Sequence, residues 1–296
     1  MTRLELGRVG VWGHLDSLSA AEARGYAARV DELGYAALWV PETVGREPFT
    51  LLGMLAAVTT RLVLGSSIVN IWGRDAQATR MGAMTLSEAT AGRFILGLGV
   101  SHPHLAGKLR GHEYARPLSR MREYLAAYRA AVYRGPTAPD APEPPVLVAA
   151  LRERMTDLAA TDADGAFPYL VTPERVAWMR SRLDLARSDV RPILAVSLPV
   201  VLGEDQDARA AARAYLTPYL RTPTYRASWE LQGFAAEDCE PPGSDRLVDA
   251  MVSVGSAALA RERIGALHRA GADHVAILPL APDGSTEHLP TLEALA

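Results

Sequence analysis

The chain has 296 residues, of which 49% are apolar and 22% charged, with a mean hydropathy of +0.02 and a formal net charge of −3 at pH 7. This composition is typical of a soluble globular protein, and the slightly negative charge argues against binding to nucleic acid or to an anionic membrane surface. The single cysteine, Cys239, excludes an internal disulfide framework and a metal site built from several cysteines.

Membrane and export signals are not evident in the sequence. No apolar run approaches the roughly 18 residues of a membrane-spanning helix, and the N-terminus lacks the apolar run of a signal peptide. We therefore expect a soluble cytoplasmic protein, and at this size an enzyme acting on a small-molecule substrate rather than a scaffold.

Short apolar runs alternate with longer amphipathic segments along the whole chain. The apolar runs predict strands over residues 8–14, 37–42, 61–69, 94–102, 145–151, 165–170, 192–202 and 274–280. Apolar residues at helical spacing predict helices over residues 20–33, 48–59, 76–91, 117–133, 154–162, 172–187, 207–220 and 257–270.

The expected strands are largely apolar on both faces, which is typical of parallel strands that are buried on both sides. The repeated strand-then-helix order implies right-handed crossovers and a parallel sheet. About eight such units in a chain of this length predict an α/β fold, a closed (β/α)8 or TIM barrel, as one domain over residues 1–296. An open, doubly wound sheet is the alternative.

Two segments interrupt the alternation. Residues 135–145 are rich in proline and acidic residues and predict a stiff surface connection. Residues 222–245 carry several prolines and glycines and look like an insertion after the seventh strand. Insertions at this end of barrel strands commonly form lids or substrate walls. A surface excursion without such a role is the alternative.

Candidate site residues follow the predicted strands, because barrel active sites lie at the carboxyl ends of the strands. Aromatic rings, hydroxyls, an amide, a carboxylate and two imidazoles converge there, a mixture that suits a flat conjugated ligand. Taken singly, each residue has a structural alternative: Glu42 can cap the next segment, and His102 can bond to the backbone of its loop. The converging residues are Trp12, Gly13, His14, Pro41, Glu42, Ser67, Ile68, Val69, Asn70, Trp72, Val100, Ser101, His102, Ala150, Leu151 and Arg152.

Several other kinds of site fit the sequence poorly. His102 and His104 have no neighbouring carboxylate, so a catalytic metal site is disfavoured. No G-x-S-x-G elbow is present, and the glycines before His102 lie on the fourth strand rather than the first, which argues against a dinucleotide-binding turn. The turn from strand to helix near Arg152 suits a phosphate, because the first backbone N–H groups of a helix are free donors. Solvated arginines at a helix start are the alternative.

Six motifs occur in order over nearly the whole chain: LGYAALWVPE (33–42), RLVLGSSIVNIWGRDA (61–76), GRFILGLGVSH (92–102), RPLSRMREYL (116–125), DGAFPYLVTPERV (164–176) and AGADHVAI (270–277). Together they resemble the luciferase-like monooxygenase superfamily, within its branch of oxidoreductases that use coenzyme F420, a 5-deazaflavin. The resemblance implies a TIM barrel, in agreement with the strand count.

The resemblance also implies where a cofactor would bind. A non-proline cis peptide is expected at Ser67–Ile68, behind the central deazaflavin ring. The cofactor phosphate is expected on the turn after strand five, where relatives often have a glycine-rich turn and this chain has Ala149-Ala150-Leu151. The residues expected to contact the cofactor are Trp12, His14, Ser67, Ile68, Asn70, Gly99, Ser101, Ala150, Leu151, Arg152, Met155 and Tyr169.

Relatives of this type place a histidine after strand two and a glutamate after strand four. This chain has the reverse, Glu42 after strand two and His102 after strand four. We expect His102 to be the catalytic acid or base, because a proton must move with the hydride, and Glu42 to be its polarising partner. Contact of both side chains with the cofactor ring is the alternative.

The resemblance leads to one expected function and two alternatives. The expected function is hydride transfer between coenzyme F420 and a small organic substrate. The alternatives are a monooxygenase that uses reduced FMN and oxygen, and a cofactor-binding protein without turnover. Trp12, Trp72, Trp229 and the 222–245 segment would form the substrate wall, which favours an apolar or aromatic substrate. Relatives are commonly dimers, so a homodimer is expected.

Overall fold

The computed structural model describes residues 4–139, 143–185 and 190–296, and its ten strands form a single sheet. The strands are β1 (Val9–Trp12), β2 (Ala37–Val40), β3 (Val63–Ser66), β4 (Val69–Asn70), β5 (Phe94–Gly99), β6 (Val146–Val148), β7 (Gly165–Ala166), β8 (Ile193–Leu202), β9 (Ser253–Gly255) and β10 (His274–Leu280). All of their pairings are parallel.

The sheet closes on itself. Its order is β10-β1-β2-β3-β5-β6-β7-β8, and β8 pairs with β10 to complete the ring. The eight-stranded parallel barrel is therefore confirmed, and the open sheet is wrong. Two short strands are additional: β4 pairs with β5 beyond the end of β3, and β9 pairs with the carboxyl end of β8.

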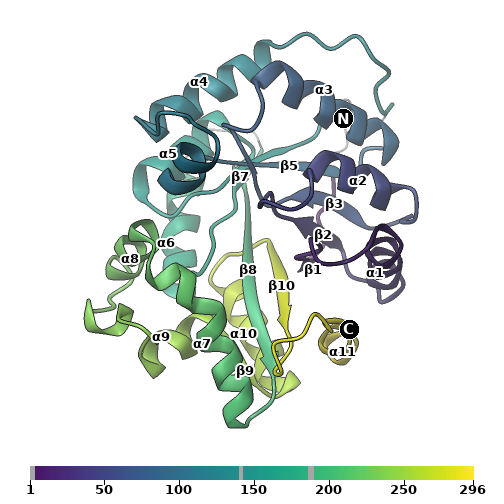
Figure 1. Ribbon diagram of the computed structural model, residues 1–296. Helices are drawn as coiled ribbons and strands as arrows, with labels where there is room; N and C mark the ends of the chain where they lie inside the picture. Colours follow the sequence, from purple (N-terminus) through teal and green to yellow (C-terminus); the bar gives the residue numbers. More distant parts are fainter. Residues whose placement is uncertain (1–3, 140–142, 186–189) are drawn as a thin grey trace.

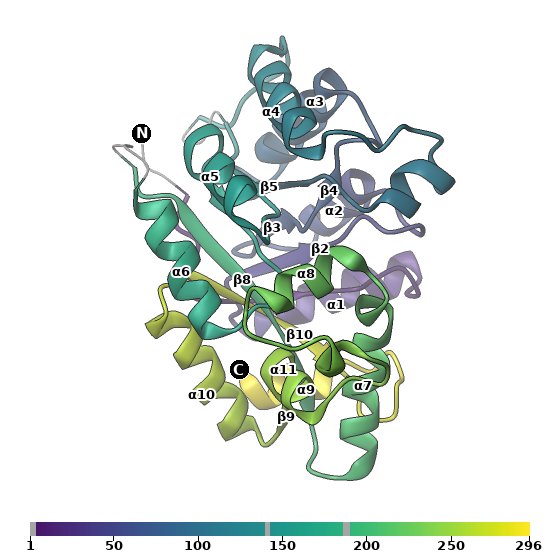
Figure 2. The same cartoon turned by 90° about the vertical axis from the view of Figure 1, so that its left-hand side faces the viewer.

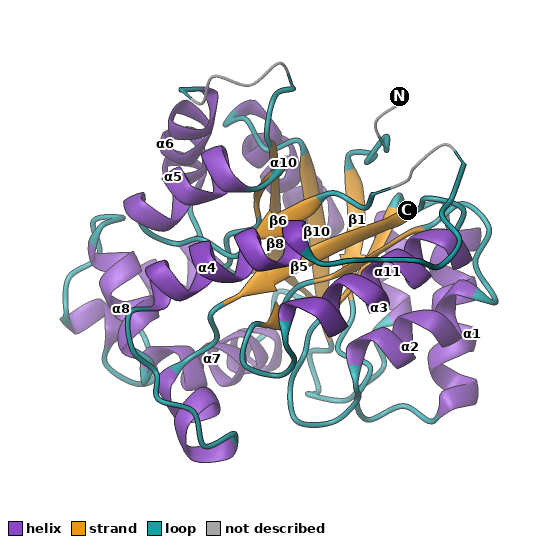
Figure 3. Cartoon of the chain, turned by 90° about the horizontal axis from the view of Figure 1, so that it is seen from above, coloured by secondary structure: helices purple, strands orange, loops and turns teal. Residues whose placement is uncertain are grey.

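Helices surround the barrel (Figure 3). They are α1 (Ala20–Glu32), α2 (Pro48–Ala56), α3 (Ala76–Ala89), α4 (Pro117–Ala130), α5 (Glu153–Asp162), α6 (Pro173–Asp184), α7 (Gln206–Leu220), α8 (Pro223–Glu230), α9 (Asp245–Met251), α10 (Ala257–Arg269) and α11 (Leu289–Leu295). A π-helix, η1 (His104–Leu109), follows β5, and a 3₁₀ turn, η2 (Glu237–Cys239), follows α8. None of the described helices is long and apolar enough to cross a membrane.

Local sequence explains where many helices begin. A side-chain oxygen at each of these starts accepts a hydrogen bond from a free backbone N–H group of the first turn, which stabilises the helix. Ser19 and Glu22 form a reciprocal capping box at α1. The other capping side chains are Glu47, Asp75, Thr172, Asp205, Ser244 and Ser256.

The strands are buried on both faces because one face fills the barrel and the other packs under the helices. Trp39 lies in the inner cluster, with its ring centroid 4.8 Å from that of Phe167, whereas Leu38 and Val40 belong to the outer cluster. Gly65 makes room for the indole, since a Cβ there would lie 2.3 Å from the Trp39 ring. This alternation explains why the strand runs are apolar throughout.

Helical turns make up only part of the segment 222–245, and the sequence did not predict their positions. The segment contains α8 and η2, which lie with α7 and α9 beside the barrel (Figures 1 and 2). Side chains from these elements form a second apolar cluster. Trp229 is fully buried in that cluster and donates a hydrogen bond to the Leu170 carbonyl at 3.2 Å. The prediction that Trp229 forms a substrate wall is therefore wrong, because its ring is fully buried against other apolar side chains.

Other differences from the predicted elements are smaller. The expected strand over 61–69 is divided into β3 and β4, and the one over 165–170 is only β7. Residues 140–142 of the expected surface connection, and the end of the expected helix over 172–187, lie outside the described residues. Strand β9 and helix α11 were not predicted.

Candidate active site

The first cavity lies at the carboxyl ends of β5, β6 and β7 and has a volume of about 250 Å³. Part of its wall comes from Tyr114, Phe167, Thr224 and Tyr225, of which the last two belong to α8. The predicted site residues that line it are Ile68, Gly99, Ser101, His102, Ala150, Leu151, Arg152, Met155 and Tyr169. The structure therefore brings together most of the predicted residues that follow the third to sixth predicted strands, which correspond to β3 with β4, β5, β6 and β7.

The bulge between β3 and β4 forms one side of this cavity. The Ser67–Ile68 peptide is cis, as expected. Ile68 packs against β5, where a Cβ on Gly99 would lie 2.4 Å from its Cδ1 atom. Trp12 reaches over the bulge from β1, and its Nε1 donates to both the carbonyl and the hydroxyl of Ser67 at 3.2 Å. The bulge is thus held between β1 and β5.

The start of α5 forms the opposite, polar side. Arg152 precedes the helix in an extended conformation, and within the described part of the chain its side chain makes no capping hydrogen bond. The exposed guanidinium lies at the cavity beside the first turn. Because a helix start carries free N–H donors and a partial positive charge, this side of the cavity suits a phosphate.

His102 lines the same cavity in a half-buried position. Its ring is 5.9 Å from that of His104 and 5.6 Å from that of Tyr225. Its buried Nδ1 atom has no hydrogen-bond partner in residues 4–139, 143–185 and 190–296. Burial lowers the pKa of His102, and the nearby His104 lowers it further, so the ring is neutral at pH 7. A neutral imidazole facing a cavity can accept or donate a proton.

Glu42 is bound to residues other than His102. Its side chain is only 5% exposed, and its carboxylate accepts hydrogen bonds from Arg74 at 3.1 and 3.2 Å and from Arg110 at 3.0 Å. It also accepts the backbone N–H of Asn70 at 2.7 Å. The predicted partnership of Glu42 with His102 is wrong, because two arginines already neutralise this carboxylate.

Asn70 and Trp72 belong to the surroundings of Glu42 rather than to the cavity. The Asn70 Oδ1 atom accepts the backbone N–H of Trp72 at 3.1 Å. Trp72 stands behind Tyr114, with ring centroids 5.8 Å apart, and lines a groove between α3 and α4. The prediction that Trp72 forms a substrate wall is therefore wrong, and Asn70 does not line the cavity.

A second cavity of about 390 Å³ lies at the ends of β1 and β10, against α7. The predicted residues Trp12 and His14 line it, together with Tyr215, Tyr219 and His288. Burial lowers the pKa of His288, and the neighbouring His14 lowers it further. The two tyrosines and His288 were not predicted as site residues. The spacing of Tyr215 and Tyr219 on one face of α7 was a signal, but nothing placed that face over the barrel.

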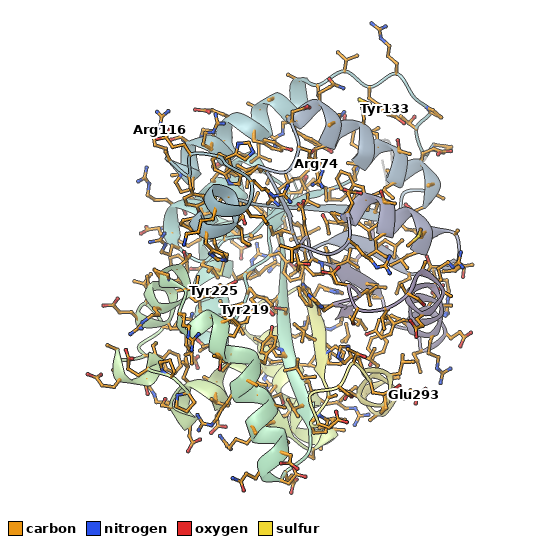
Figure 4. The ribbon with its side chains drawn as sticks, in the orientation of Figure 1. Arg74, Arg116, Tyr133, Tyr219, Tyr225 and Glu293 are labelled. Carbon is orange, nitrogen blue, oxygen red and sulfur yellow. The ribbon has the colours of Figure 1, made fainter. Side chains whose placement is uncertain are left out.

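Four aromatic rings, Trp12, Tyr169, Tyr219 and Tyr225, stand between the two cavities and are called here the aromatic partition. The centroid of Tyr169 is 6.0 Å from that of Trp12 and 5.6 Å from that of Tyr219. Tyr219 and Tyr225 meet edge to face at 5.0 Å, and both are labelled in Figure 4. The Tyr169 and Tyr219 hydroxyl oxygens are 3.4 Å apart, so this pair joins one cavity to the other.

Comparison with known proteins agrees with this architecture. Residues 4–274 match the model of the family described as luciferase-like monooxygenase. A Mycobacterium tuberculosis protein, provisionally named a coenzyme F420-dependent oxidoreductase, is 27% identical over 282 residues, which cover 83% of this chain and 80% of that protein.

Solved structures share the fold at low sequence identity. The coenzyme F420-dependent tetrahydromethanopterin reductase from Methanopyrus kandleri superposes with a TM-score of 0.80 at 16% identity, covering 98% of this chain and 97% of the other. The oxygenating constituent of 3,6-diketocamphane monooxygenase from Pseudomonas putida, in complex with FMN, gives a TM-score of 0.73 at 16% identity and the same two coverages. Proteins named for either cofactor thus share this barrel.

Proposed function

Because the chain belongs to the luciferase-like monooxygenase family, we propose that it is an oxidoreductase that binds coenzyme F420 in the first cavity and exchanges a hydride with a small organic substrate. One observation carries the proposal: the same cavity has apolar and aromatic walls on one side, and the positive start of α5 with the Arg152 guanidinium on the other. Flat walls suit a conjugated ring, and the positive end suits its phosphate.

The residues present fit such a cofactor. Ile68 and Met155 offer apolar contacts on two sides of the cavity, while Arg152 and the first turn of α5 would hold a phosphate. Ala149 and Ala150 replace the expected glycines, yet both line the cavity. A bound deazaflavin supplies two-electron hydride chemistry. His102 would hold or release the proton that accompanies the hydride, because its ring lines the cavity and is neutral at pH 7.

The choice of F420 over FMN is supported by the name of the Mycobacterium tuberculosis relative and by the reductase that superposes on this chain. A monooxygenase that uses reduced FMN is the second candidate, because an FMN-bound monooxygenase shares the fold over 98% of the chain. Both cofactors carry a flat ring and a phosphate, so the walls of the first cavity suit either of them.

Binding titrations of the apo-protein with coenzyme F420 and, separately, with FMN test the proposal. Tight binding of F420 alone is expected. Arg152→Ala should weaken F420 about tenfold, because a charge-assisted hydrogen bond to phosphate is lost. Arg154→Ala is the matched control, since Arg154 is the second residue of α5 and does not line the cavity. His102→Gln should bind F420 normally and lose turnover. A preference for FMN contradicts the proposal and favours the second candidate.

A further inference from the structure

Helix α6 contributes a buried arginine to the turn that connects β6 to α5. Arg175 is only 7% exposed, and its Nη2 atom donates a hydrogen bond to the Leu151 carbonyl at 2.6 Å. The Cζ atom of Arg175 lies 3.7 Å from the centroid of the Trp178 ring, which belongs to the same helix and fixes the direction of the side chain. Leu151 lines the first cavity, whereas Arg175 lines a groove outside it. Arg175 therefore holds this turn from outside the cavity.

Within the described residues, no carboxylate lies at ion-pair distance from Arg175. The partners of its guanidinium are a carbonyl and an aromatic ring, and the buried Nε atom has no hydrogen-bond partner there. The neighbouring Glu153 pairs instead with Arg182 at 3.2 Å. Burial lowers the pKa of Arg175 and Glu153 raises it, and a guanidinium stays charged at pH 7. Because buried charges are usually paired, an anion bound at the adjacent turn would supply the missing negative charge.

The contact with Leu151 also sets the orientation of the next N–H group. In a trans peptide the C=O and N–H groups point in opposite directions, so a Leu151 carbonyl directed at Arg175 turns the Arg152 N–H away from α6. Arg152 lines the first cavity, and its N–H has no hydrogen-bond acceptor in the part of the chain that the structure describes. A hydrogen bond to the carbonyl also polarises the peptide, which makes its N–H a stronger donor.

We propose that Arg175 is a positioning residue for a phosphate: by holding the Leu151 carbonyl, it directs the Arg152 N–H into the first cavity, where this N–H and the first turn of α5 bind the anion. The inference rests on the proposed function, because the phosphate is that of the proposed cofactor. Arg175 does not line the first cavity, so it acts through the turn and through its charge rather than by contact with the ligand.

Two ligands that share a ring separate this role from a general effect on the fold. One is coenzyme F420, and the other is the 5-deazaflavin that ends at the ribityl chain and lacks the phosphate and the groups beyond it. The parent protein should bind F420 at least tenfold more tightly. Arg175→Met keeps an apolar side chain on Trp178 but loses the charge and the hydrogen bond, so it should weaken F420 about tenfold. It should change the affinity for the phosphate-free deazaflavin less than twofold.

The conservative variant Arg175→Lys keeps the positive charge and a donor for the carbonyl. It should weaken F420 less than threefold, because the turn and the charge beside it are largely preserved. If Arg175→Met does not fold, as judged by circular dichroism, Arg175→Gln takes its place. This uncharged variant should also weaken F420 more than Arg175→Lys does, and spare the phosphate-free deazaflavin.

Arg180 provides the matched control on the same helix. It is 6% exposed and donates to the Pro192 carbonyl at 2.9 Å, and it forms an ion pair with Asp273 at 3.2 Å. Pro192 precedes β8, so these contacts lie at the amino ends of the strands, away from the first cavity. Arg180→Met should destabilise the protein in urea unfolding and leave the ratio of the two ligand affinities unchanged.

The inference is overturned if the parent protein binds both deazaflavins equally, if the uncharged variants leave the F420 affinity unchanged or weaken both ligands equally, or if Arg180→Met changes the ratio as much. Failure of the proposed function is distinguishable. A parent protein that binds FMN and not F420 contradicts the cofactor assignment, and the ratio of FMN to riboflavin affinity then tests Arg175 in the same way. A parent protein that binds neither cofactor overturns both proposals.

Discussion

At the scale of single residues, His274 makes the stability of the buried core depend on pH. The side chain is fully buried at the start of β10, and its Nε2 atom is 3.0 Å from the Trp39 indole nitrogen. An indole N–H can only donate, so Nε2 must accept and the ring proton lies on Nδ1, where it bonds to the Gly7 carbonyl. Burial lowers the pKa of His274 to about 4, because a charged ring there would lose its hydration.

This arrangement predicts a loss of stability in acid. An unfolded histidine has a pKa of about 6.5 and takes up a proton earlier than the folded one, so the free energy of unfolding is fully retained above that pH. It should fall as pH decreases from about 6.5 to 4, by about 3 kcal/mol from this residue. Urea unfolding measured at a series of pH values gives the slope.

His274→Gln is the matched variant, because an amide cannot be protonated in this range. At pH 7 the variant should be less stable than the parent protein, because the substitution removes packing around the ring. The free energy of unfolding of the variant should, however, depend less on pH. The half-buried His102, His268 and His288 also have lowered pKa values and contribute to the slope of both proteins. Parallel slopes for the parent and His274→Gln would contradict the assignment to His274.

At the scale of elements, the segment after β5 is tied to the barrel by a buried ion cluster. Glu42 follows β2, Arg110 follows η1, and their charged groups are 3.0 Å apart. A Cβ on Gly73 would lie 2.9 Å from the Glu42 carboxylate and 3.1 Å from the Arg110 guanidinium, so the cluster is closely surrounded. We infer that Glu42 holds the segment that carries His102, rather than acting on the ring itself.

A double-mutant cycle measures this tie. Glu42→Ala and Arg110→Ala should each destabilise the protein, and the double variant should lose less than the sum, with a coupling energy of about 1–3 kcal/mol. The exposed pair Arg120 and Glu123, 3.4 Å apart, is the control, and its coupling should stay within about 0.5 kcal/mol. Backbone amides of η1 should exchange hydrogen faster in Arg110→Ala. Equal coupling in the two cycles would refute the role of Glu42.

Elements with strong local signals could be predicted from the sequence, and elements that depend on tertiary packing could not. The expected helix over 20–33 agrees with α1, because Ser19 caps its start and Gly34, at φ +83°, follows its end. Local signals are weaker for the short elements β9 and α11: α11 has a proline in its first turn, but its cap residue His288 makes no side-chain hydrogen bond. The cis peptide at Ser67–Ile68 followed from family resemblance, since no local pattern requires it.

The candidate site also has a part that the sequence could predict and a part that it could not. Residues directly after β3, β5 and β6 could be placed together, because the carboxyl ends of parallel barrel strands meet at one face. Tyr219 and Tyr225 could not, because they come from α7 and α8, whose position over the barrel depends on tertiary contacts. The arginines that form ion pairs with Glu42 were not predicted, for the same reason. Arg110 is distant from Glu42 in sequence and reaches the carboxylate only after η1 folds.

At the scale of the whole molecule, the last helix closes the structure over the first units of the barrel. In α11, Leu292 is fully buried in the outer core, and its carbonyl accepts a hydrogen bond from the Tyr35 hydroxyl at 2.7 Å. Arg29 of α1 forms an ion pair with Glu293 at 2.8 Å. Glu293 is labelled in Figure 4. Arg261 of α10 donates to the Ala294 carbonyl at 2.7 Å. Helix α11 therefore contacts α1, α10 and the turn that precedes β2.

If the chain unfolds as one domain, damage to this junction must destabilise the whole barrel. Leu292→Ala should lower the free energy of unfolding by about 2–5 kcal/mol, because it leaves a cavity in the core. Glu293→Ala, one residue further on, should have a much smaller effect, because exposed ion pairs contribute little. Denaturant unfolding followed by far-UV and near-UV circular dichroism should give coincident transitions for both variants. Separate transitions in Leu292→Ala would mean that α11 detaches alone, and that closure of the barrel does not depend on it.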